Sequence, residues 1–140
     1  MKKQAVLTIC GTQYYPGQDP EVIELTTDGT LEFVDGGWDI CYEESELTGL
    51  KGTTTTFRLE PGCVILRRSG SLQSEMVFRE GIPHESLYHM DFGTLLLSVC
   101  AKSIEASIDD HGGTIDLVYA ISIEQGEAGM VEYHLDIQTK

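Results

Sequence analysis

The chain has 140 residues, of which 41% are hydrophobic, and its 23 acidic residues against nine lysines and arginines give a formal net charge of −14. This length suits one domain, and the apolar content supports a core and argues against global disorder. The acidic balance argues against nucleic acid and anionic membrane surfaces as partners. It is interpreted first as a source of solubility, and alternatively as a docking surface for a basic protein partner.

The N-terminal residues predict neither export nor membrane insertion. Two lysines precede an apolar stretch at residues 5–10, which is shorter than the about 7–15 residues of a secretory signal or the about 20 of a transmembrane helix. A cytoplasmic protein is therefore expected. The cysteines are scattered singly, so reduced thiols that serve mostly as small core residues are expected; they are Cys10, Cys41, Cys63 and Cys100.

The N-terminal part of the chain alternates apolar and polar residues, which predicts strands. The first covers residues 5–9. Residues 23–33 keep one parity across Thr27-Asp28-Gly29 and form either one long bent strand or a hairpin. After a glycine turn, Trp38, Ile40 and Tyr42 face one way. A helical turn is compatible only with residues 44–50.

The middle of the chain continues with strands at residues 53–59, 63–69, 72–78 and 85–90, separated by turns that contain glycine. The segment 95–108 changes parity, because its apolar side chains lie at odd positions up to Ala101 and at even positions from Ile104. A regular strand cannot change face without an extra residue. A β-bulge or sharp bend is therefore predicted near Lys102-Ser103.

The last two strands show the clearest alternation, over residues 114–124 and 131–138, with a hairpin loop at 125–129 between them. About ten short strands with hairpin links predict one all-β domain over residues 1–140. The predicted architecture is an antiparallel meander that closes into a β-barrel of about 8–10 strands, since closure removes exposed sheet edges. A two-sheet sandwich is the alternative.

Several runs of residues, in this order along nearly the whole chain, resemble the YwiB-like family of small bacterial proteins. They are Tyr42-Glu43-Glu44-Ser45-Glu46-Leu47, Gly52-Thr53-Thr54-Thr55, Arg68-Ser69-Gly70, Met76-Val77-Phe78, Tyr88 with Phe92-Gly93, and Gly112-Gly113. The resemblance implies a calycin-like (lipocalin-like) barrel and a bacterial cytoplasmic protein. That family has no established activity, so the resemblance assigns no catalytic residue.

Two charged residues continue apolar faces of predicted strands. Glu44 follows the series Trp38, Ile40 and Tyr42, and Arg68 follows residues 64 and 66. Unpaired buried charges are costly, so Glu44 and Arg68 are predicted to approach each other inside the barrel, near its mouth. They form a structural ion pair or reach solvent, or else Arg68 anchors a ligand carboxylate.

The leading functional hypothesis is a non-catalytic barrel that binds a small, partly apolar molecule. Inward-facing aromatic residues would form the cavity wall, namely Trp38, Tyr42, Phe57 and Tyr119. The candidate ligand-binding residues are Glu44, Arg68, Tyr42, Trp38 and Tyr119. The alternative is an acidic protein-interaction module with a solid core. An enzyme ranks third, because no nucleophile, base and oxyanion site can be assembled. A cavity of several hundred Å³ would favour the ligand hypothesis.

No catalytic residue, metal site or cofactor is predicted. The four histidines lack metal-ligand spacing and are interpreted as surface residues; they are His84, His89, His111 and His134. The threonine run at residues 53–56 suits a strand, with Thr53 or Thr55 as a candidate for the cavity wall.

Overall fold

The fold consists of ten β-strands in a computed structural model, which describes residues 2–44, 51–90, 93–124, 126 and 128–140. No helix occurs in these ranges. The strands are β1 (Lys3–Tyr14), β2 (Glu21–Val34), β3 (Gly37–Glu43), β4 (Thr53–Glu60), β5 (Cys63–Gly70), β6 (Ser74–Phe78), β7 (Pro83–Met90), β8 (Gly93–Asp109), β9 (Gly112–Ile123) and β10 (Ala128–Thr139).

The strands form one antiparallel sheet in the order β6-β5-β4-β3-β2-β1-β10-β9-β8-β7. Neighbours in the sheet are neighbours in the chain, except that β1 pairs with β10. The two edge strands, β6 and β7, lie against each other, because Gln73 and His89 exchange backbone hydrogen bonds of 2.8 and 2.9 Å. The predicted meander barrel, nearly closed, is thus confirmed and replaces the sandwich alternative. The calycin-like relationship stays a prediction.

The seam between β6 and β7 relies on side chains as well as on this bridge. The Ser86 hydroxyl donates to the Glu75 carbonyl oxygen at 2.6 Å, and the Val77 amide donates to Nδ1 of His84 at 3.3 Å. These bonds take the place of a regular ladder. The barrel therefore has one side at which the backbone pairing is weakest.

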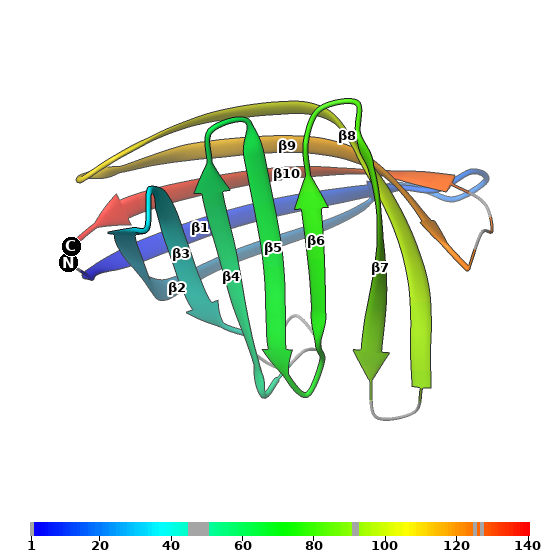
Figure 1. The fold of residues 1–140 in the computed structure, drawn as a ribbon, viewed down its shortest axis with the longest axis horizontal. Helices are drawn as coiled ribbons and strands as arrows, with labels where there is room; N and C mark the ends of the chain where they lie inside the picture. The colour runs from blue at the N-terminus through cyan, green and yellow to red at the C-terminus, as the bar shows by residue number, and fades with distance from the viewer. Residues whose placement is uncertain (1, 45–50, 91–92, 125, 127) are drawn as a thin grey trace.

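Strand β8 bends where the sequence predicts a bulge. Ala101 pairs with Tyr119, and Ser103 pairs with Val118, which is adjacent to Tyr119 on β9. Lys102 is therefore the extra residue of a bulge and has no pairing partner on β9. The first part of β8 runs beside β7, and its second part runs beside β9. In Figure 1, β4, β5 and β6 cross in front of β9 and β10, and β8 curves from one strand direction to the other. The bulge prediction is confirmed, and the bend turns the sheet back on itself.

Residues 21–34 form one long strand, so the hairpin alternative for this segment is wrong. Strand β2 pairs with β1 as far as Leu31 and with β3 from Thr30. Gly29 lies at this change of partner, where a Cβ atom would come within 2.5 Å of the Cys41 carbonyl oxygen. Only glycine lets the strands approach this closely.

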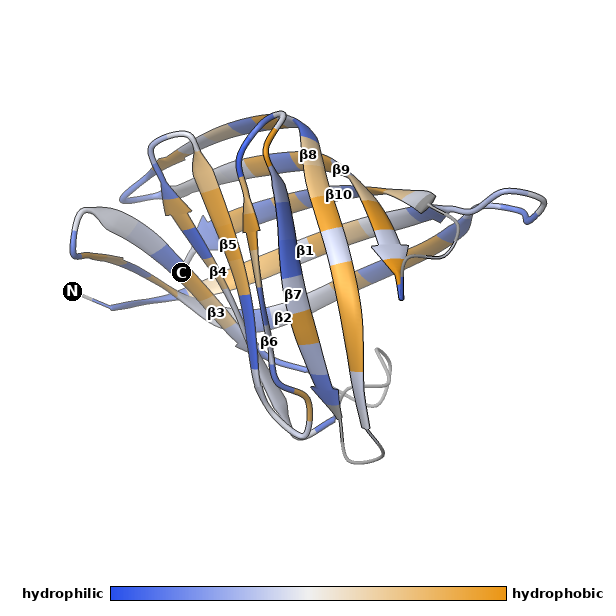
Figure 2. Cartoon of the chain, turned by 45° about the vertical axis from the view of Figure 1, so that its right-hand side comes forward, coloured by the Kyte–Doolittle hydropathy of each residue, from blue (hydrophilic) through white to orange (hydrophobic). Residues whose placement is uncertain are grey.

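The interior is packed at one end and hollow at the other. Inward positions near the start of β1 and the end of β10 are fully buried, as are their neighbours; the largest such side chains include Phe57, Phe78, Leu7, Leu31, Ile40, Leu66, Ile115, Leu117, Leu135 and Ile137. Burying each side chain of this size contributes about 1.5–3 kcal/mol. The alternation of hydrophobic and hydrophilic residues that produces this core is visible along the strands in Figure 2.

The remaining predictions concern the cysteines and local boundaries. All four cysteines are free, as predicted, but only Cys63 is buried, so the expectation that most of them are core residues is wrong. Strand β6 begins at Ser74, two residues later than predicted. The predicted helical turn falls mostly on residues 45–50, outside the described residues. Among the described residues, no helix is long and apolar enough to cross a membrane.

Candidate ligand cavity

A cavity of about 350 Å³ occupies the hollow end of the barrel. Most of its wall is apolar, because the inward positions of β1, β2, β8, β9 and β10 continue past the packed core. Its aliphatic lining comprises Ile9, Ile23, Leu25, Met76, Leu95, Leu97, Ile121, Ile123 and Val131. Ile23 and Ile123 are each 42% exposed, so the apolar lining reaches solvent at this end.

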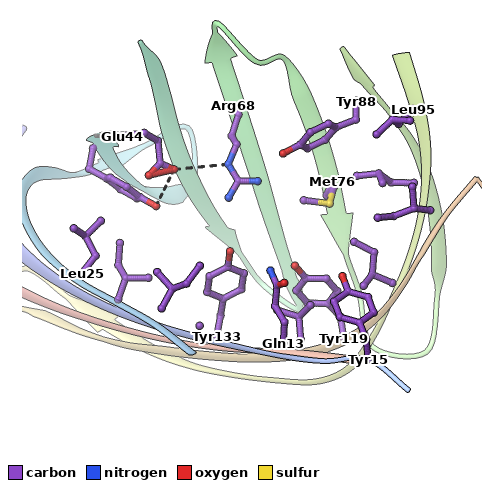
Figure 3. A pocket seen from close by; sticks show the side chains of 18 residues that line it. Gln13, Tyr15, Leu25, Glu44, Arg68, Met76, Tyr88, Leu95, Tyr119 and Tyr133 are labelled. Carbon is purple, nitrogen blue, oxygen red and sulfur yellow. Dashed lines mark hydrogen bonds and ion pairs between the residues drawn. The ribbon is translucent and has the colours of Figure 1, made fainter. Parts of the chain in front are cut away.

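Glu44, which directly follows β3, and Arg68 of β5 face this cavity, as Figure 3 shows. Nε of Arg68 lies 3.8 Å from Oε2 of Glu44, and the side chains are only 11% and 2% exposed, respectively. The predicted approach of these two charges is confirmed. Their ligand-binding role stays a prediction.

The position of Glu44 follows from the strand that precedes it. Its backbone amide donates to the Thr53 carbonyl oxygen at 2.8 Å, which extends the β3–β4 ladder by one residue. Side chains therefore keep alternating, and Glu44 points to the same side as Tyr42 and Ile40. Parity places the carboxylate inside the barrel.

The carboxylate of Glu44 is only partly satisfied. Its Oε2 accepts hydrogen bonds from Thr55 Oγ1 at 2.8 Å and from the Tyr42 hydroxyl at 3.4 Å. Its Oε1 is buried without a hydrogen-bond partner among the described residues, and so is Nε of Arg68. Two oppositely charged groups beside a cavity thus keep unused hydrogen-bonding capacity, which is unusual for buried polar atoms.

Tyrosines supply most of the other polar groups. Five of the six tyrosines line the cavity, namely Tyr15, Tyr42, Tyr88, Tyr119 and Tyr133. In Figure 3 the hydroxyls of Tyr119 and Tyr133 point from the floor toward the wall that carries Arg68. The rings of Tyr119 and Tyr133 stack with centroids 6.3 Å apart. Burial raises the pKa values of Tyr42, Tyr88 and Tyr119, so these phenols stay protonated donors at neutral pH.

Four of the five predicted site residues line this cavity: Tyr42, Glu44, Arg68 and Tyr119. Trp38 does not, which corrects the predicted set. It lies toward the packed end, where it lines a separate, open hollow and its ring contacts Phe33 edge-on with centroids 4.9 Å apart. Its parity is inward, but four residues of strand separate it from Tyr42 by about 13 Å. Phe57, which was also expected in the wall, is buried in the packed core.

Sequence reasoning missed several cavity residues. Gln13, Tyr15, Tyr88 and Tyr133 all line the cavity, and Gly11 makes room beside Tyr133, whose ring a Cβ atom at position 11 would approach to 3.1 Å. A signal for Tyr133 was available, because it shares the apolar face of β10. The others depend on which end of the barrel is left hollow, and local parity does not reveal this.

The histidines and threonines lie outside the cavity wall. His89, His111 and His134 are exposed, which confirms their interpretation as surface residues, whereas His84 is partly buried at the seam. Thr55 is buried and acts on the cavity through its hydrogen bond to Glu44.

Together the fold and this site define a β-barrel protein with an internal cavity at one end. A family model described as a domain of unknown function, DUF1934, matches residues 7–137. The chain belongs to this family.

Two comparisons with a Bacillus subtilis protein agree with this assignment. The chain is 31% identical over 104 residues to the "Uncharacterized beta-barrel protein YwiB" of strain 168, which covers 74% of this chain and 71% of that protein. The crystal structure of the ywiB protein from Bacillus subtilis superposes with a TM-score of 0.89 at 23% identity, over 99% of this chain and 93% of that one. The second comparison establishes the shared fold.

Proposed function

We propose that this barrel binds a small, partly apolar molecule in its cavity, with an acidic group of that molecule held at Arg68. The observation that carries the proposal is the incompletely paired Arg68 beside a largely apolar space of about 350 Å³. Small-molecule sites combine apolar walls of about this volume, at the lower end of the usual range, with a few convergent polar groups. A guanidinium is well suited to bind a carboxylate.

The alternative of an interaction module with a solid core is less well supported. The packed end of the barrel would suffice for stability, and a solid module has no need of a second, hollow end. Filling that end with side chains would gain about 25 cal/mol for each Å² of apolar surface removed from water. The sequence instead places Gly11 and Gln13 at inward positions of β1, where the core residues Leu7 and Ile9 precede them.

Native mass spectrometry of the protein purified from its own cells tests the proposal. The wild-type protein is expected to carry an additional small mass that acid denaturation releases. Arg68→Met should lose this mass, because its side chain has no charge to hold an acid. Arg67→Met is the matched control, since Arg67 is the neighbouring residue on β5 and forms an exposed pair with Glu75 at 3.0 Å.

The two variants decide how the result is read. Retention of the mass by Arg67→Met and its loss from Arg68→Met would support binding in the cavity. A bare chain mass for the wild-type protein, or equal retention by both variants, would contradict the proposal.

A further inference from the structure

The charge balance of the cavity narrows the chemistry of its ligand. Arg68 already faces the carboxylate of Glu44, so the pair is close to neutral. An anionic ligand at Arg68 would add a second negative charge beside Glu44 in a partly desolvated site, and like charges in such a site repel. The formal net charge of −14 opposes anions at longer range as well.

The unused hydrogen-bonding groups of the pair are a separate observation, and they too argue against a simple anion as the ligand. Oε1 of the almost fully buried Glu44 lacks a donor among the described residues. The guanidinium of Arg68 carries N–H donors only, and Figure 3 shows it directed into the cavity. A ligand that bonds to both side chains must present a donor and an acceptor close together, because the two side chains approach to 3.8 Å, between Nε of Arg68 and Oε2 of Glu44.

An α-amino acid has this arrangement, since its ammonium and carboxylate groups are attached to one carbon. As a zwitterion it adds no net charge. The ammonium would donate to Glu44, and the carboxylate would accept from Arg68. The hydroxyls of Tyr88 and Tyr133, which line the same cavity, are further donors for the carboxylate.

The rest of the cavity sets the size of the ligand. Its volume of about 350 Å³ equals the liquid volume of about a dozen waters, and so fits a molecule of on the order of a dozen non-hydrogen atoms. The aliphatic side chains and tyrosine rings of the wall suit a large apolar or aromatic group. A polar amino-acid side chain would lose its water there with little compensation, because most of the wall is apolar.

We propose that the cavity binds a free α-amino acid with a large apolar or aromatic side chain, its ammonium group on Glu44 and its carboxylate on Arg68. This inference rests on the proposed function and names the ligand class for the same site. It differs from the binding of a simple acid, because the negative charge of Glu44 would repel such a ligand. Glu44 is here a recognition residue.

Isothermal titration calorimetry with three probes of one shape tests the inference on the wild-type protein. L-phenylalanine has both charged groups, 3-phenylpropanoate lacks the ammonium, and 2-phenylethylamine lacks the carboxylate. L-phenylalanine is expected to bind, and each analogue is expected to bind about 10–100-fold more weakly, because it leaves one buried charge without its hydrogen bond.

A variant of Glu44 should change the order of the three affinities. Glu44→Gln is expected to weaken L-phenylalanine by at least about 10-fold while sparing or improving 3-phenylpropanoate, because the repulsion is removed. Glu43→Gln is the matched control, as Glu43 is the preceding residue of β3 and is exposed; it should leave all three affinities unchanged. If a variant fails to fold, the three-probe order on the wild-type protein decides alone.

The outcomes separate the ligand class from the proposed function. Binding of 3-phenylpropanoate as tight as that of L-phenylalanine, or tightest binding of 2-phenylethylamine, would overturn the zwitterion. Absence of L-phenylalanine binding would overturn it as well. The proposed function would survive each of these results if the purified protein still carried a small mass that depends on Arg68, and would fail only without that mass.

Discussion

Within the cavity, the orientation of Glu44 depends on three neighbours from three strands. Tyr42, Thr55 and Arg68 all approach its Oε2, and two of them donate hydrogen bonds to it. The carboxylate is therefore held in one orientation, which leaves Oε1 buried without a hydrogen-bond partner among the described residues. Each neighbour is an inward-facing residue of β3, β4 or β5, so strand parity alone brings the group together.

Removal of Arg68 should destabilise the fold. Arg68→Met leaves the charge of Glu44 buried without a counter-ion, and we expect a loss of roughly 2–4 kcal/mol in the free energy of unfolding in urea. Glu44→Gln combined with Arg68→Met should recover part of that loss. Arg67→Met, which breaks an exposed pair, should cost under about 1 kcal/mol. Equal effects of the two arginine substitutions would show that Glu44 does not depend on Arg68.

The cavity tyrosines should make stability depend on alkaline pH. Burial raises the folded-state pKa values of Tyr42, Tyr88 and Tyr119, whereas tyrosines of the unfolded chain ionise near about pH 10. Because the folded-state pKa values are higher, the protonated tyrosines favour the folded state. Their contribution to the free energy of unfolding is complete below about pH 10 and is lost as the pH rises above that value. Absorbance titration should show three tyrosines that ionise late, with a parallel fall in unfolding free energy. Six tyrosines titrating together near about pH 10 would contradict the burial.

At the scale of elements, the packed end is fixed by an arginine on the outer face of β4. Arg58 donates to Glu60 at 2.8 Å and to Asp39 at 3.0 Å. Its other terminal nitrogen donates to the carbonyl oxygens of Val34 and Asp35 at 3.0 Å each, in the turn from β2 to β3. One side chain thus ties three consecutive strands and their turn together.

Loss of these bonds should cost more than loss of an exposed ion pair. Arg58→Met is expected to lower the free energy of unfolding by about 1–3 kcal/mol, since four acceptors lose a charged donor. Urea unfolding beside Arg67→Met, which loses an exposed pair on β5, provides the comparison. A loss no greater than that of Arg67→Met would mean that Arg58 does not fix the turn.

The sequence predicted the secondary-structure elements well, but it did not predict where each residue lies along the length of the barrel. Period-two alternation located all ten strands, and the change of parity at Lys102 predicted the bulge, because both depend on neighbouring residues only. The pairing of Glu44 with Arg68 followed from the same rule. Trp38 was misplaced because parity gives the face of a strand and not the distance from its end. Which end is hollow depends on side chains from nine strands at once.

For the whole molecule, the seam between β6 and β7 is the side at which the barrel is least tied. Strand β6 has a regular ladder only with β5, and β7 has a regular ladder only with β8. Strands β1 and β10 pair regularly on both edges. The barrel therefore combines a rigid side with a weaker one, and Arg68 lies on β5, next to the weaker one.

Hydrogen exchange should reflect this difference. Backbone amides of β6 and β7 are expected to exchange faster than those of β1 and β10, because local opening at the seam breaks fewer hydrogen bonds. Exchange monitored by NMR gives the rates residue by residue. Equal protection of the two pairs of strands would contradict the assignment of the seam as the weak side.

The central claim, that the hollow end of the barrel receives a small molecule, is tested most directly by methyl NMR. L-phenylalanine and, in a separate titration, 3-phenylpropanoate are added to protein labelled at isoleucine, leucine and valine methyl groups. We predict saturable shifts from at least one probe, while the packed-core residues Leu31, Ile40, Leu66 and Ile115 stay unchanged. The shifts should be confined to the methyl groups that line the cavity, namely those of Ile9, Ile23, Leu25, Leu95, Leu97, Ile121, Ile123 and Val131. Saturable shifts confined to the outer surface or to the packed end would contradict the claim.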